Sequence, residues 1–510
     1  MGSTCRSIVS AGADGIVIDI ECHLSNNLPT IVIVGFASKT VNEAKDRLRG
    51  AFANSHIELP RRRITINLAP ADIPKTDSGL DLAIAVAILI ANEQIAPLDA
   101  NQAVVGELGL DGSIRPVRGV IGKLLSARRL GLTSFYIPLG NLSQAQLIPG
   151  LTLYPLSNLH QLYEHLTAKR DVQPVLTGDG IYPSNVERFQ TEISQLSDIV
   201  GQESAKRAIT IAAAGGHNVF LSGPPGTGKS MLAKALPALL PPLNHEEMLE
   251  VTQLNSLASK DYEQLATRRP IRSPHHSASH TAMVGGGNNL RPGEISLSHR
   301  GVLFLDELPE FTRPTLEALR QPLEDQVINI VRTKDTVQYP ANFILVATAN
   351  PCPCGYYGMP DDRCDCSPAL LSRYRSKLSG PILDRIDLCC SVYEVDHKKL
   401  LTRPDQRSDD AEIRKQVRLA RAFQAKRHGS NTTLNSDLSN RELQQYAQLT
   451  RPAKIALQDA AVRLDLSARA YMRTVKVART IADLEQSPEI ERHHLAESLA
   501  YRQRPTETLV

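Results

Sequence analysis

The residues whose types and spacing most clearly indicate chemistry form a glycine-rich loop. The loop follows a β-rich run, 218–222, and precedes a helical stretch, 231–240. Its eight residues are Gly223, Pro224, Pro225, Gly226, Thr227, Gly228, Lys229 and Ser230. Glycines let backbone N–H groups approach phosphates, and a helix N-terminus adds positive potential. Because Lys229 can neutralise the β- and γ-phosphates and Ser230 can bind Mg²⁺, the loop predicts a site for ATP and magnesium.

Two further apolar runs end in polar side chains that such a site needs. The run 301–305 is typical of a buried parallel strand and leads to Asp306 and Glu307, at the end where α/β sheets hold ligands. We expect Asp306 to hold Mg²⁺ through water and Glu307 to polarise a water that attacks the γ-phosphate. The run 343–349 ends in Asn350, whose amide could position that water. Taken alone, Asn350 is an ordinary turn residue at a strand end.

The elements that position these residues belong to an α/β unit, 197–395, in a multidomain chain. Residues 1–168 alternate β-branched runs with helical patterns and predict a separate α/β domain. Glycine and proline interrupt a polar stretch, 169–196, which we interpret as a linker. The remainder, 396–510, predicts an all-helical domain.

The domain 1–168 contains short segments with distinct periodicities. Its expected elements are strands at 15–20, 30–34 and 63–67 and helices at 41–55 and 80–92.

Composition narrows the class of protein. The chain has 510 residues, 42% of them hydrophobic and 22% charged, which suits several ordinary domains. No run approaches the roughly 20 apolar residues of a membrane span, and the start lacks a secretory signal pattern. We therefore expect a cytoplasmic protein with no membrane partner. The net charge of +3 neither requires nor excludes a nucleic acid.

These segments resemble the AAA+ ATPases, and specifically the magnesium-chelatase-like branch that includes the ComM (YifB) proteins. The resemblance covers nearly the whole chain and includes the segments 274–279, 285–287, 292–299, 319–324 and 379–387. It implies a P-loop ATPase core with a parallel sheet and a C-terminal α-helical lid domain. Motifs of this length are far more specific than the glycine-rich loop.

The resemblance also implies roles for single residues. Val200, Gly201 and Gln202 would lie beside the adenine, and Asn350 would be sensor 1. Arg385 would be the arginine finger and Arg469 would be sensor 2. A finger acts across a subunit boundary, so it implies a homo-oligomer, expected to be a hexamer, and fingers contribute about 10³–10⁵ in rate. Without the resemblance, either arginine could be an ordinary surface ion-pair residue.

Two segments could face a central pore in such a ring. The irregular stretch 268–299 lacks apolar periodicity and is expected to be a projecting loop, not a buried element. A hairpin at 326–338 would carry Arg332 and Lys334, which could grip DNA phosphates. The alternative is a solvated hairpin with two ordinary charges. His275 and His276 lie in the first segment and are not expected to bind metal, because adjacent histidines point in different directions.

Four of the eight cysteines lie within fifteen residues. They are Cys352, Cys354, Cys364 and Cys366. A tetrahedral Zn²⁺ site is the sharpest hypothesis, although structural zinc sites usually have Cys-x₂₋₄-Cys spacing instead of the Cys-x-Cys found here. Free thiols and a redox pair are the alternatives.

The first domain resembles the proteolytic domain of Lon-type proteases, in the segments 65–74, 105–113 and 116–127. That family uses a serine–lysine dyad, and Lys123 falls at the lysine position. Gly79 occupies the position of the nucleophile, while Ser78 comes one residue early, too far for the reach that a dyad needs. We therefore expect no peptidase activity, a retained fold that serves oligomerisation or partner binding, and Lys123 on a helix surface.

Different classes of function remain open. The resemblance implies a hexameric, ATP-dependent DNA motor that drives branch migration of recombination intermediates during natural transformation. The runner-up is a chelatase-type ATPase subunit that remodels a metal-inserting or other protein partner. A protease and a non-hydrolysing scaffold are weaker alternatives. Because the chain has no Trp and only 4% aromatic residues, we expect contacts to the backbone of branched or single-stranded DNA instead of base stacking.

Overall fold

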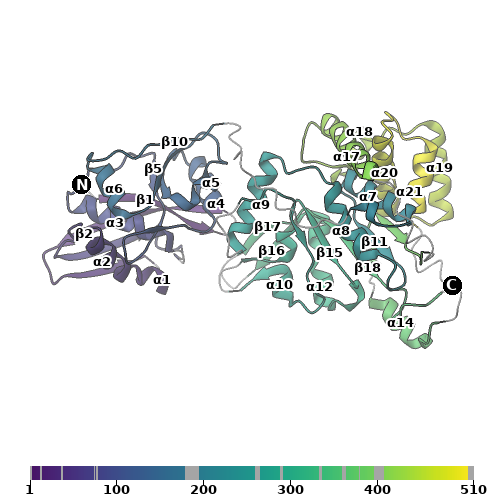
Figure 1. The fold of residues 1–510 in the computed structure, drawn as a ribbon, viewed down its shortest axis with the longest axis horizontal. Helices are drawn as coiled ribbons and strands as arrows, with labels where there is room; N and C mark the ends of the chain where they lie inside the picture. The colour runs from purple at the N-terminus through teal and green to yellow at the C-terminus, as the bar shows by residue number, and fades with distance from the viewer. Residues whose placement is uncertain are drawn as a thin grey trace. The chain divides into compact units, whose positions relative to one another are not determined.

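The computed structural model of the chain describes residues 3–11, 14–35, 38–73, 75, 78–178, 195–258, 265–287, 291–331, 336–358, 363–377, 380–395 and 407–502. These residues divide into two compact units (Figure 1). The first comprises 1–187, 248–266 and 331–338, and the second comprises 188–247, 267–330 and 339–510. Within the described ranges, no helix is long and apolar enough to cross a membrane.

In the first unit, two four-stranded sheets share one core. One sheet has the order β1-β2-β4-β3, in which only β3 and β4 run parallel, and the other has the order β10-β9-β8-β5. The strands are β1 (Ser3–Ala11), β2 (Asp14–Ser25), β3 (Thr30–Val34), β4 (Arg63–Ala69), β5 (Gln102–Val104), β8 (Ser134–Pro138), β9 (Thr152–Leu156) and β10 (Val175–Leu176). A small hairpin joins β6 (Glu107–Leu108) to β7 (Ile114–Arg115). The three strands expected from sequence are confirmed, with different ends for two of them.

The helices of this unit are α1 (Lys39–Asn42), α2 (Ala44–Asn54), α3 (Asp81–Ala91), α4 (Val120–Arg129), α5 (Leu142–Ala145) and α6 (Leu159–Leu166). The helix expected at 80–92 is α3, and every residue from Asp81 to Ile90 is buried. A helix that is apolar on all sides must be enclosed, and α3 contacts β1, β2 and α2. The expected helix at 41–55 is divided between α1 and α2.

Two features of the first unit differ from the sequence-based expectations. Part of the expected linker, Val175–Leu176, forms β10 and pairs with β9, while 179–194 lie outside the described residues. The prediction that Lys123 lies on a helix surface is wrong, because its side chain is 0% exposed. The helix α4 packs directly on β2, and a Cβ on Gly15 would lie 2.7 Å from the Cα of Lys123.

The second unit is built on a parallel five-stranded sheet, as far as the described residues show. Its order is β12-β15-β18-β11-β19, and each neighbouring pair is parallel. The strands are β11 (Val219–Ser222), β12 (Ile271–Arg272), β15 (Val302–Leu305), β18 (Ile344–Ala349) and β19 (Leu388–Ser391). Every residue of β11, β15 and β18 is buried, as expected for strands covered on both faces.

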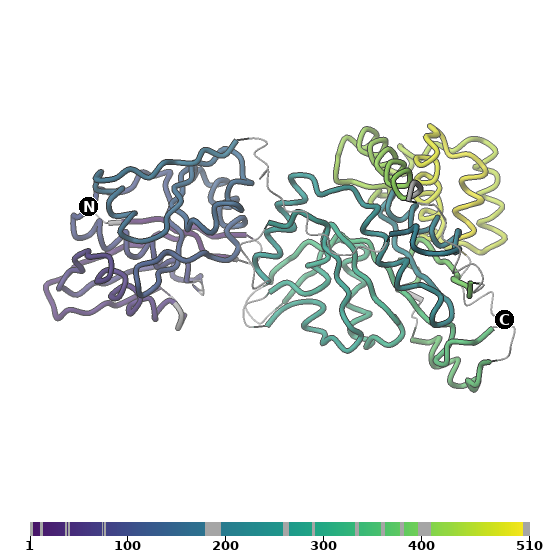
Figure 2. Tube along the Cα trace, in the orientation of Figure 1, coloured from purple at the N-terminus to yellow at the C-terminus, as the bar shows by residue number. Residues whose placement is uncertain are grey.

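Helices of the second unit cover this sheet and connect its strands (Figure 2). They are α7 (Glu203–Gly215), α8 (Lys229–Leu239), α10 (His280–Val284), α11 (Glu294–Leu297), α12 (Arg313–Ala318), α13 (Arg320–Asp325), α14 (Pro368–Lys377) and α15 (Gly380–Leu383). A further helix, α9 (His245–Ala258), begins in this unit, and its residues from Met248 onward belong to the first unit. Apolar residues of α7 and α8 join those of β11, β15 and β18 in a single core.

The segment 268–299 is not the projecting loop that we expected. It contains β12, which joins the sheet, together with α10, α11 and the short pair β13 (Gly285–Gly286) and β14 (Arg291–Pro292). Met283 and Ile295 are 0% exposed. A Cβ on Gly293 would lie 2.4 Å from the backbone of Gly285, so close backbone packing buries the part of the segment around Gly293. The residues 268–282 are exposed or half-buried.

The C-terminal part of the second unit is helical, as predicted (Figure 1, green to yellow). Its helices are α17 (Arg407–His428), α18 (Asn440–Tyr446), α19 (Arg451–Arg463), α20 (Ala468–Leu484) and α21 (Arg492–Ala500). The helices α17 and α20 both pack against α7, which attaches this part to the sheet-bearing part. The buried carboxylate of Asp483 pairs with Arg427 and Arg479 within it.

Candidate nucleotide-binding site

The register of three strands brings the predicted phosphate and metal residues to one edge of the sheet. Ser222 at the end of β11 pairs with Ala349 on β18, and Leu305 at the end of β15 pairs with Ala347. The glycine-rich loop and Asn350 therefore leave the sheet side by side, and Asp306 leaves it beside Thr348. All of these residues lie at the carboxyl edge, where parallel α/β sheets hold their ligands.

The glycines of the loop serve two purposes. Gly226 and Gly228 have φ values of +77° and +87°, a left-handed conformation that side chains disfavour. Gly223 instead allows a close approach, because a Cβ there would lie 2.1 Å from the carbonyl oxygen of Val392. Lys229 begins α8 directly after Gly228, so the loop ends at a helix N-terminus.

Lys229 lies inside this loop and is 8% exposed. Its ammonium group donates to the carbonyl oxygens of Gly223 and Pro224, at 2.7 and 2.6 Å, and to Oδ1 of Asn350 at 3.1 Å. Burial lowers the pKa of Lys229, and the carboxylates of Asp306 and Glu307 oppose that change. The cation is thus held by weak, neutral acceptors that a phosphate oxygen can replace.

Ser230 and Asp306 form the part of the site suited to a metal ion. The Ser230 hydroxyl donates to Oδ2 of Asp306 at 3.1 Å, and the Thr348 hydroxyl donates to Oδ1 at 2.5 Å. Oxygen ligands of this kind suit Mg²⁺, which commonly takes one or two protein ligands and several waters. The pairing places the two predicted magnesium residues within reach of one ion.

Thr348 was not singled out by sequence reasoning. Its side chain is 0% exposed, and its oxygen also accepts the backbone N–H of Glu307 at 3.0 Å. A hydroxyl in the otherwise apolar strand β18 is a signal that could have identified it, because buried polar groups require partners.

Glu307 follows β15 in a conformation that few residues adopt. Its φ and ψ are 52° and 55°, in the left-handed region, and its side chain is exposed beside Asp306. Left-handed non-glycine residues cost about 1–3 kcal/mol and concentrate at functional sites. The hydrogen bond that the backbone N–H of Glu307 donates to Thr348 holds Glu307 in this conformation.

A cavity of about 560 Å³ lies beside the carboxyl end of β19, where Cys390 and Ser391 line it. Its walls include Gly201, Gln202, Tyr393 and Tyr501. The amide of Gln202 donates to the carbonyl oxygen of Tyr393 at 2.5 Å. The chain after β19 is tied to β11 by a bond from the N–H of Val392 to the carbonyl oxygen of Ser222, at 2.8 Å. The cavity therefore adjoins the carboxyl edge of the sheet.

Val200 precedes Gly201 in this segment and is half-buried. Gly201 and Gln202 both have positive φ, 67° and 61°, and α7 begins directly after them. These two left-handed residues turn the chain sharply, so that the segment expected to lie beside an adenine borders the cavity.

Arg385 and Arg469 are brought together, but not at the glycine-rich loop. Both guanidinium groups pair with the same oxygen of Glu324, at 2.7 Å for Arg385 and 3.0 Å for Arg469. The hydrogen bond from Arg385 holds the pKa of Glu324 below its usual range. Arg385 is 9% exposed and Arg469 is 65% exposed.

These arginines lie toward the opposite edge of the sheet. Arg385 comes shortly before β19, and the N–H groups of Asp387 and Leu388 donate to the carbonyl oxygen of Asn218, which directly precedes β11. Those residues mark the amino ends of both strands, and four residues of strand span about 13 Å. Glu324, which links the two arginines, ends the segment 319–324 that carries part of the family resemblance, but the sequence analysis gave it no role.

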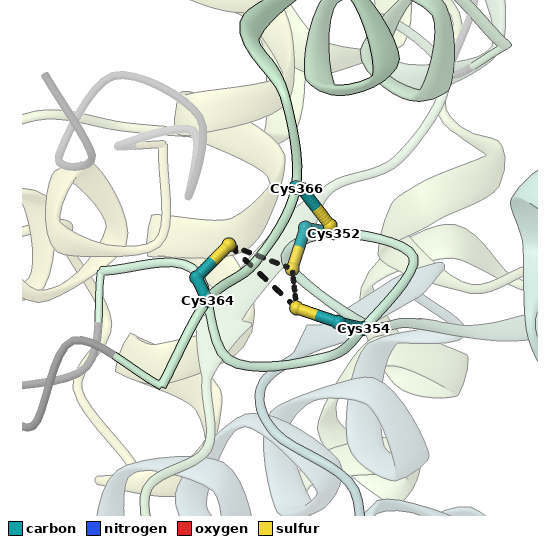
Figure 3. A group of neighbouring side chains, drawn as sticks. All are labelled: Cys352, Cys354, Cys364 and Cys366. Atoms are coloured by element: carbon teal, nitrogen blue, oxygen red, sulfur yellow. Dashed lines mark hydrogen bonds between the residues drawn. The ribbon is translucent and has the colours of Figure 1, made fainter.

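The four clustered cysteines follow Asn350 and converge (Figure 3). Their sulfur atoms all lie within 4.8 Å of one another. Cys352 is 0% exposed and the other three are half-buried. The backbone N–H of Tyr356 lowers the pKa of Cys354 to about 6. The predicted set of thiols is thus assembled in one place.

Comparison with known proteins agrees with these observations. Three family models match: "Magnesium chelatase, subunit ChlI" over 195–400, "Subunit ChlI of Mg-chelatase" over 20–141, and "Magnesium chelatase, subunit ChlI C-terminal" over 407–502. The protein YifB of Salmonella typhimurium is 44% identical over 96% of this chain and 95% of its own length. The competence protein ComM of Haemophilus influenzae is 42% identical over 97% of this chain and 96% of its own. This chain belongs to the YifB/ComM family of magnesium-chelatase-like proteins.

A magnesium-chelatase subunit is a more distant relative of this YifB/ComM family member. The 38 kDa subunit of Rhodobacter capsulatus is 27% identical over 64% of this chain and 89% of its own length. The match therefore omits about a third of the chain, whereas YifB and ComM match nearly all of it.

The hairpin expected in this family member is present, but its basic residues are not described. The strands β16 (Val327–Val331) and β17 (Thr336–Pro340) pair in a two-stranded sheet. Arg332 and Lys334 lie outside the described residues. The rings of His275 and His276 lie close together, with centroids 4.0 Å apart and planes tilted by 35°. Nδ1 of His275 is hydrogen-bonded to the Ser277 hydroxyl at 2.8 Å.

Proposed function

We propose that this protein is an ATP hydrolase that assembles into a hexameric ring and uses hydrolysis to move DNA. The observation that carries the ATPase proposal is the convergence of Lys229, Ser230, Asp306 and Asn350 at one edge of the parallel sheet. In this proposal the glycine-rich loop and Lys229 bind the phosphates. Ser230 and Asp306 hold Mg²⁺, directly or through water.

The exposed carboxylate of Glu307 lies beside Asp306 and polarises the attacking water, which Asn350 helps to position. Val200, Gly201 and Gln202 form the side of the cavity that receives the adenine. The family resemblance to AAA+ ATPases supports both assignments.

The placement of Arg385 and Arg469 supports a ring. Both pair with Glu324, toward the edge of the sheet opposite the glycine-rich loop. We propose that they serve the nucleotide of a neighbouring subunit, as an arginine finger and as sensor 2. A guanidinium supplied in this way stabilises the charge on the transferring phosphoryl group.

The DNA component of the proposal is supported by similarity to a competence protein, ComM of H. influenzae, along nearly the full chain. We propose a cytoplasmic branch-migration helicase that acts on recombination intermediates during natural transformation. Arg332 and Lys334, on the hairpin, would contact the phosphates, which gives binding that is tolerant of sequence and sensitive to salt.

We also propose that the first unit keeps a Lon-type fold without peptidase activity. The hydroxyl of Ser78 donates to the carboxylate of Glu107, an acceptor that does not activate a serine in the way a lysine base does. Absence of casein cleavage by the purified protein is the expected result. Cleavage that Ser78→Ala abolishes would contradict it.

The test of the motor is ATP-driven movement of a fluorescently labelled four-way DNA junction. The control is Glu307→Gln, which should bind ATP without hydrolysing it. Resolution of the junction by the wild type alone would support the proposal. If ATPase activity is present but no DNA form changes it and no junction moves, the DNA motor is wrong.

A second candidate is supported by the match to the R. capsulatus chelatase subunit over 89% of that protein. In that case the ring would remodel a metal-inserting or other protein partner. Stimulation of ATPase activity by such a protein partner, and not by branched DNA, would favour this candidate.

A further inference from the structure

We propose that Cys352, Cys354, Cys364 and Cys366 bind one Zn²⁺ and that this metal fixes the positions of Asn350 and Pro225 in the nucleotide site. The inference rests on the proposed function only for the role of Asn350. The binding of the metal and its mechanical link to the glycine-rich loop are independent of that role.

The distances between the sulfur atoms suit a tetrahedral metal site. Sγ of Cys352 lies 3.2 Å from Cys354 and 3.8 Å from Cys364, and Cys354 lies 3.6 Å from Cys364. A Zn–S bond of about 2.3 Å in tetrahedral geometry separates two sulfur atoms by about 3.8 Å. A disulfide would require about 2.05 Å. Small shifts of the thiols therefore complete a zinc site. Figure 3 shows the sulfur atoms of Cys352, Cys354 and Cys364 directed toward one another, with Cys366 beside them.

The backbone around Cys352 already supplies donors to its sulfur. The N–H groups of Gly355 and Tyr357 point to Sγ of Cys352 at 3.2 and 3.3 Å. Hydrogen bonds of this kind stabilise thiolates that are bound to metals, and such outer contacts orient the ligands.

Few apolar contacts hold this segment together. Of the described residues between Cys352 and Cys366, Cys352 and Gly355 are buried and the rest are half-buried or exposed. The conformational entropy of an irregular loop is about 1–2 kcal/mol per residue, so a loop without a core needs another constraint. A structural Zn²⁺ site contributes about 10–16 kcal/mol to local folding, which offsets a large part of the cost of ordering this segment.

The same segment contacts the glycine-rich loop directly. Gly355 has a φ of +91°, and a Cβ there would lie 2.6 Å from Cδ of Pro225. The backbone of Gly355, in the segment that carries the four cysteines, therefore packs against Pro225 of the glycine-rich loop.

The segment is also connected to Asn350 at both of its ends. Cys352 comes two residues after Asn350. Beyond Cys366, α14 carries Tyr374, whose hydroxyl donates to the carbonyl oxygen of Asn350 at 3.2 Å. A metal that joins Cys352 to Cys366 would therefore close a ring, which runs from Asn350 through the metal to Tyr374 and returns to Asn350 through the Tyr374 hydrogen bond. Loss of the metal should release Asn350 and the loop at Pro225 together.

The first measurement is the zinc content of the full-length protein after purification without added metal. We expect one Zn²⁺ per chain in the wild type and less than about 0.1 in the double variant Cys364→Ser/Cys366→Ser, since loss of thiolate ligands removes most of the affinity. Cys22→Ser, in β2 of the first unit, is the matched control and should retain the metal. A wild type without bound zinc that also fails to bind added Zn²⁺ would overturn the proposal.

The second measurement tests the mechanical link without using enzymatic activity. Hydrogen exchange of the Gly226 and Thr227 amides should accelerate at least about tenfold when the metal is stripped by a chelator, and re-addition of Zn²⁺ should restore it. Unchanged exchange in a stripped protein that keeps its circular dichroism spectrum would show that the metal does not reach the loop.

A third variant separates the packing contact from the metal. Gly355→Ala should retain one Zn²⁺ but weaken binding of a fluorescent ATP analogue about tenfold or more, because the new Cβ displaces Pro225. Zinc content and exchange rates remain informative if no junction moves, so failure of the DNA proposal is distinguishable from failure of this one. Unaltered analogue binding by Gly355→Ala would remove the contact with Pro225 from the proposal.

Discussion

Substitution of Thr348 tests whether its hydroxyl positions Asp306, the residue proposed to hold Mg²⁺. The oxygen donates to Asp306 and accepts from the backbone N–H of Glu307, at 2.5 and 3.0 Å. Thr348→Val removes both bonds while nearly preserving the shape of the side chain. The matched control Thr348→Ser keeps the hydroxyl and loses only a methyl group.

The expected magnitudes follow from the two lost bonds. A hydrogen bond to a charged carboxylate contributes about 1.5–3 kcal/mol, and an N–H left without a partner costs about 1–3 kcal/mol. The extra methyl group of valine offsets about 0.8 kcal/mol. We therefore expect the free energy of unfolding to fall by about 2–5 kcal/mol in Thr348→Val. For Thr348→Ser we expect a loss of about 1 kcal/mol.

The functional consequence should exceed the loss of stability. Residues that orient a metal ligand typically change metal affinity about 10–100-fold when they are removed. The assay is the Mg²⁺ concentration that gives half-maximal ATPase activity, measured well below the unfolding temperature, together with urea unfolding followed by circular dichroism. If valine and serine give the same Mg²⁺ dependence and the same unfolding midpoint, Thr348 does not position Asp306.

Three further outcomes are expected. Gly223→Ala should lower the urea unfolding midpoint more than Gly226→Ala does, because the new Cβ at 223 would lie 2.1 Å from the backbone of Val392. The new Cβ at 226 would have no neighbour within 4 Å, so that variant should lose only the about 1–2 kcal/mol that a left-handed conformation costs. Equal midpoints for the two variants would contradict this. Glu324→Gln should destabilise the protein by about 1 kcal/mol or less, since the carboxylate is 37% exposed, and that difference should shrink in high salt. Burial raises the pKa of Asp387, but Arg473 and His217 outweigh it and hold the pKa well below its usual range. The folded pKa is therefore the lower one, so stability present above about pH 4 is lost as the pH falls, and Asp387→Asn should flatten that part of the stability profile.

Much of the second unit could be predicted because strong local patterns set its sheet. The runs that became β11, β15 and β18 are mostly apolar and lead into polar residues, and a parallel sheet aligns such ends at one edge. Lys229 and Asn350 could be placed together on that ground. What could not be predicted from local pattern is the partner of each side chain, such as Thr348 for Asp306.

The incorrect expectations share a physical cause. Burial of Lys123 and of the segment around Gly293 depends on which neighbours pack against them, and neither residue has an apolar signature of its own. The meeting of Arg385 with Arg469 through Glu324 also depends on contacts between residues far apart in the chain. Sequence spacing carries little information about such contacts.

The separation of the two arginines from the glycine-rich loop determines which subunit's nucleotide site a substitution would impair. If the ring is as proposed, Arg385→Ala leaves a chain's own phosphate-binding loop intact and impairs the site of the adjacent chain, whereas Lys229→Ala does the reverse. Mixing these two inactive variants would therefore create some interfaces with two intact halves. With equal, random mixing, about one interface in four would combine an unaltered loop with an unaltered arginine. Rings mixed from the two inactive variants should therefore regain part of the ATPase activity.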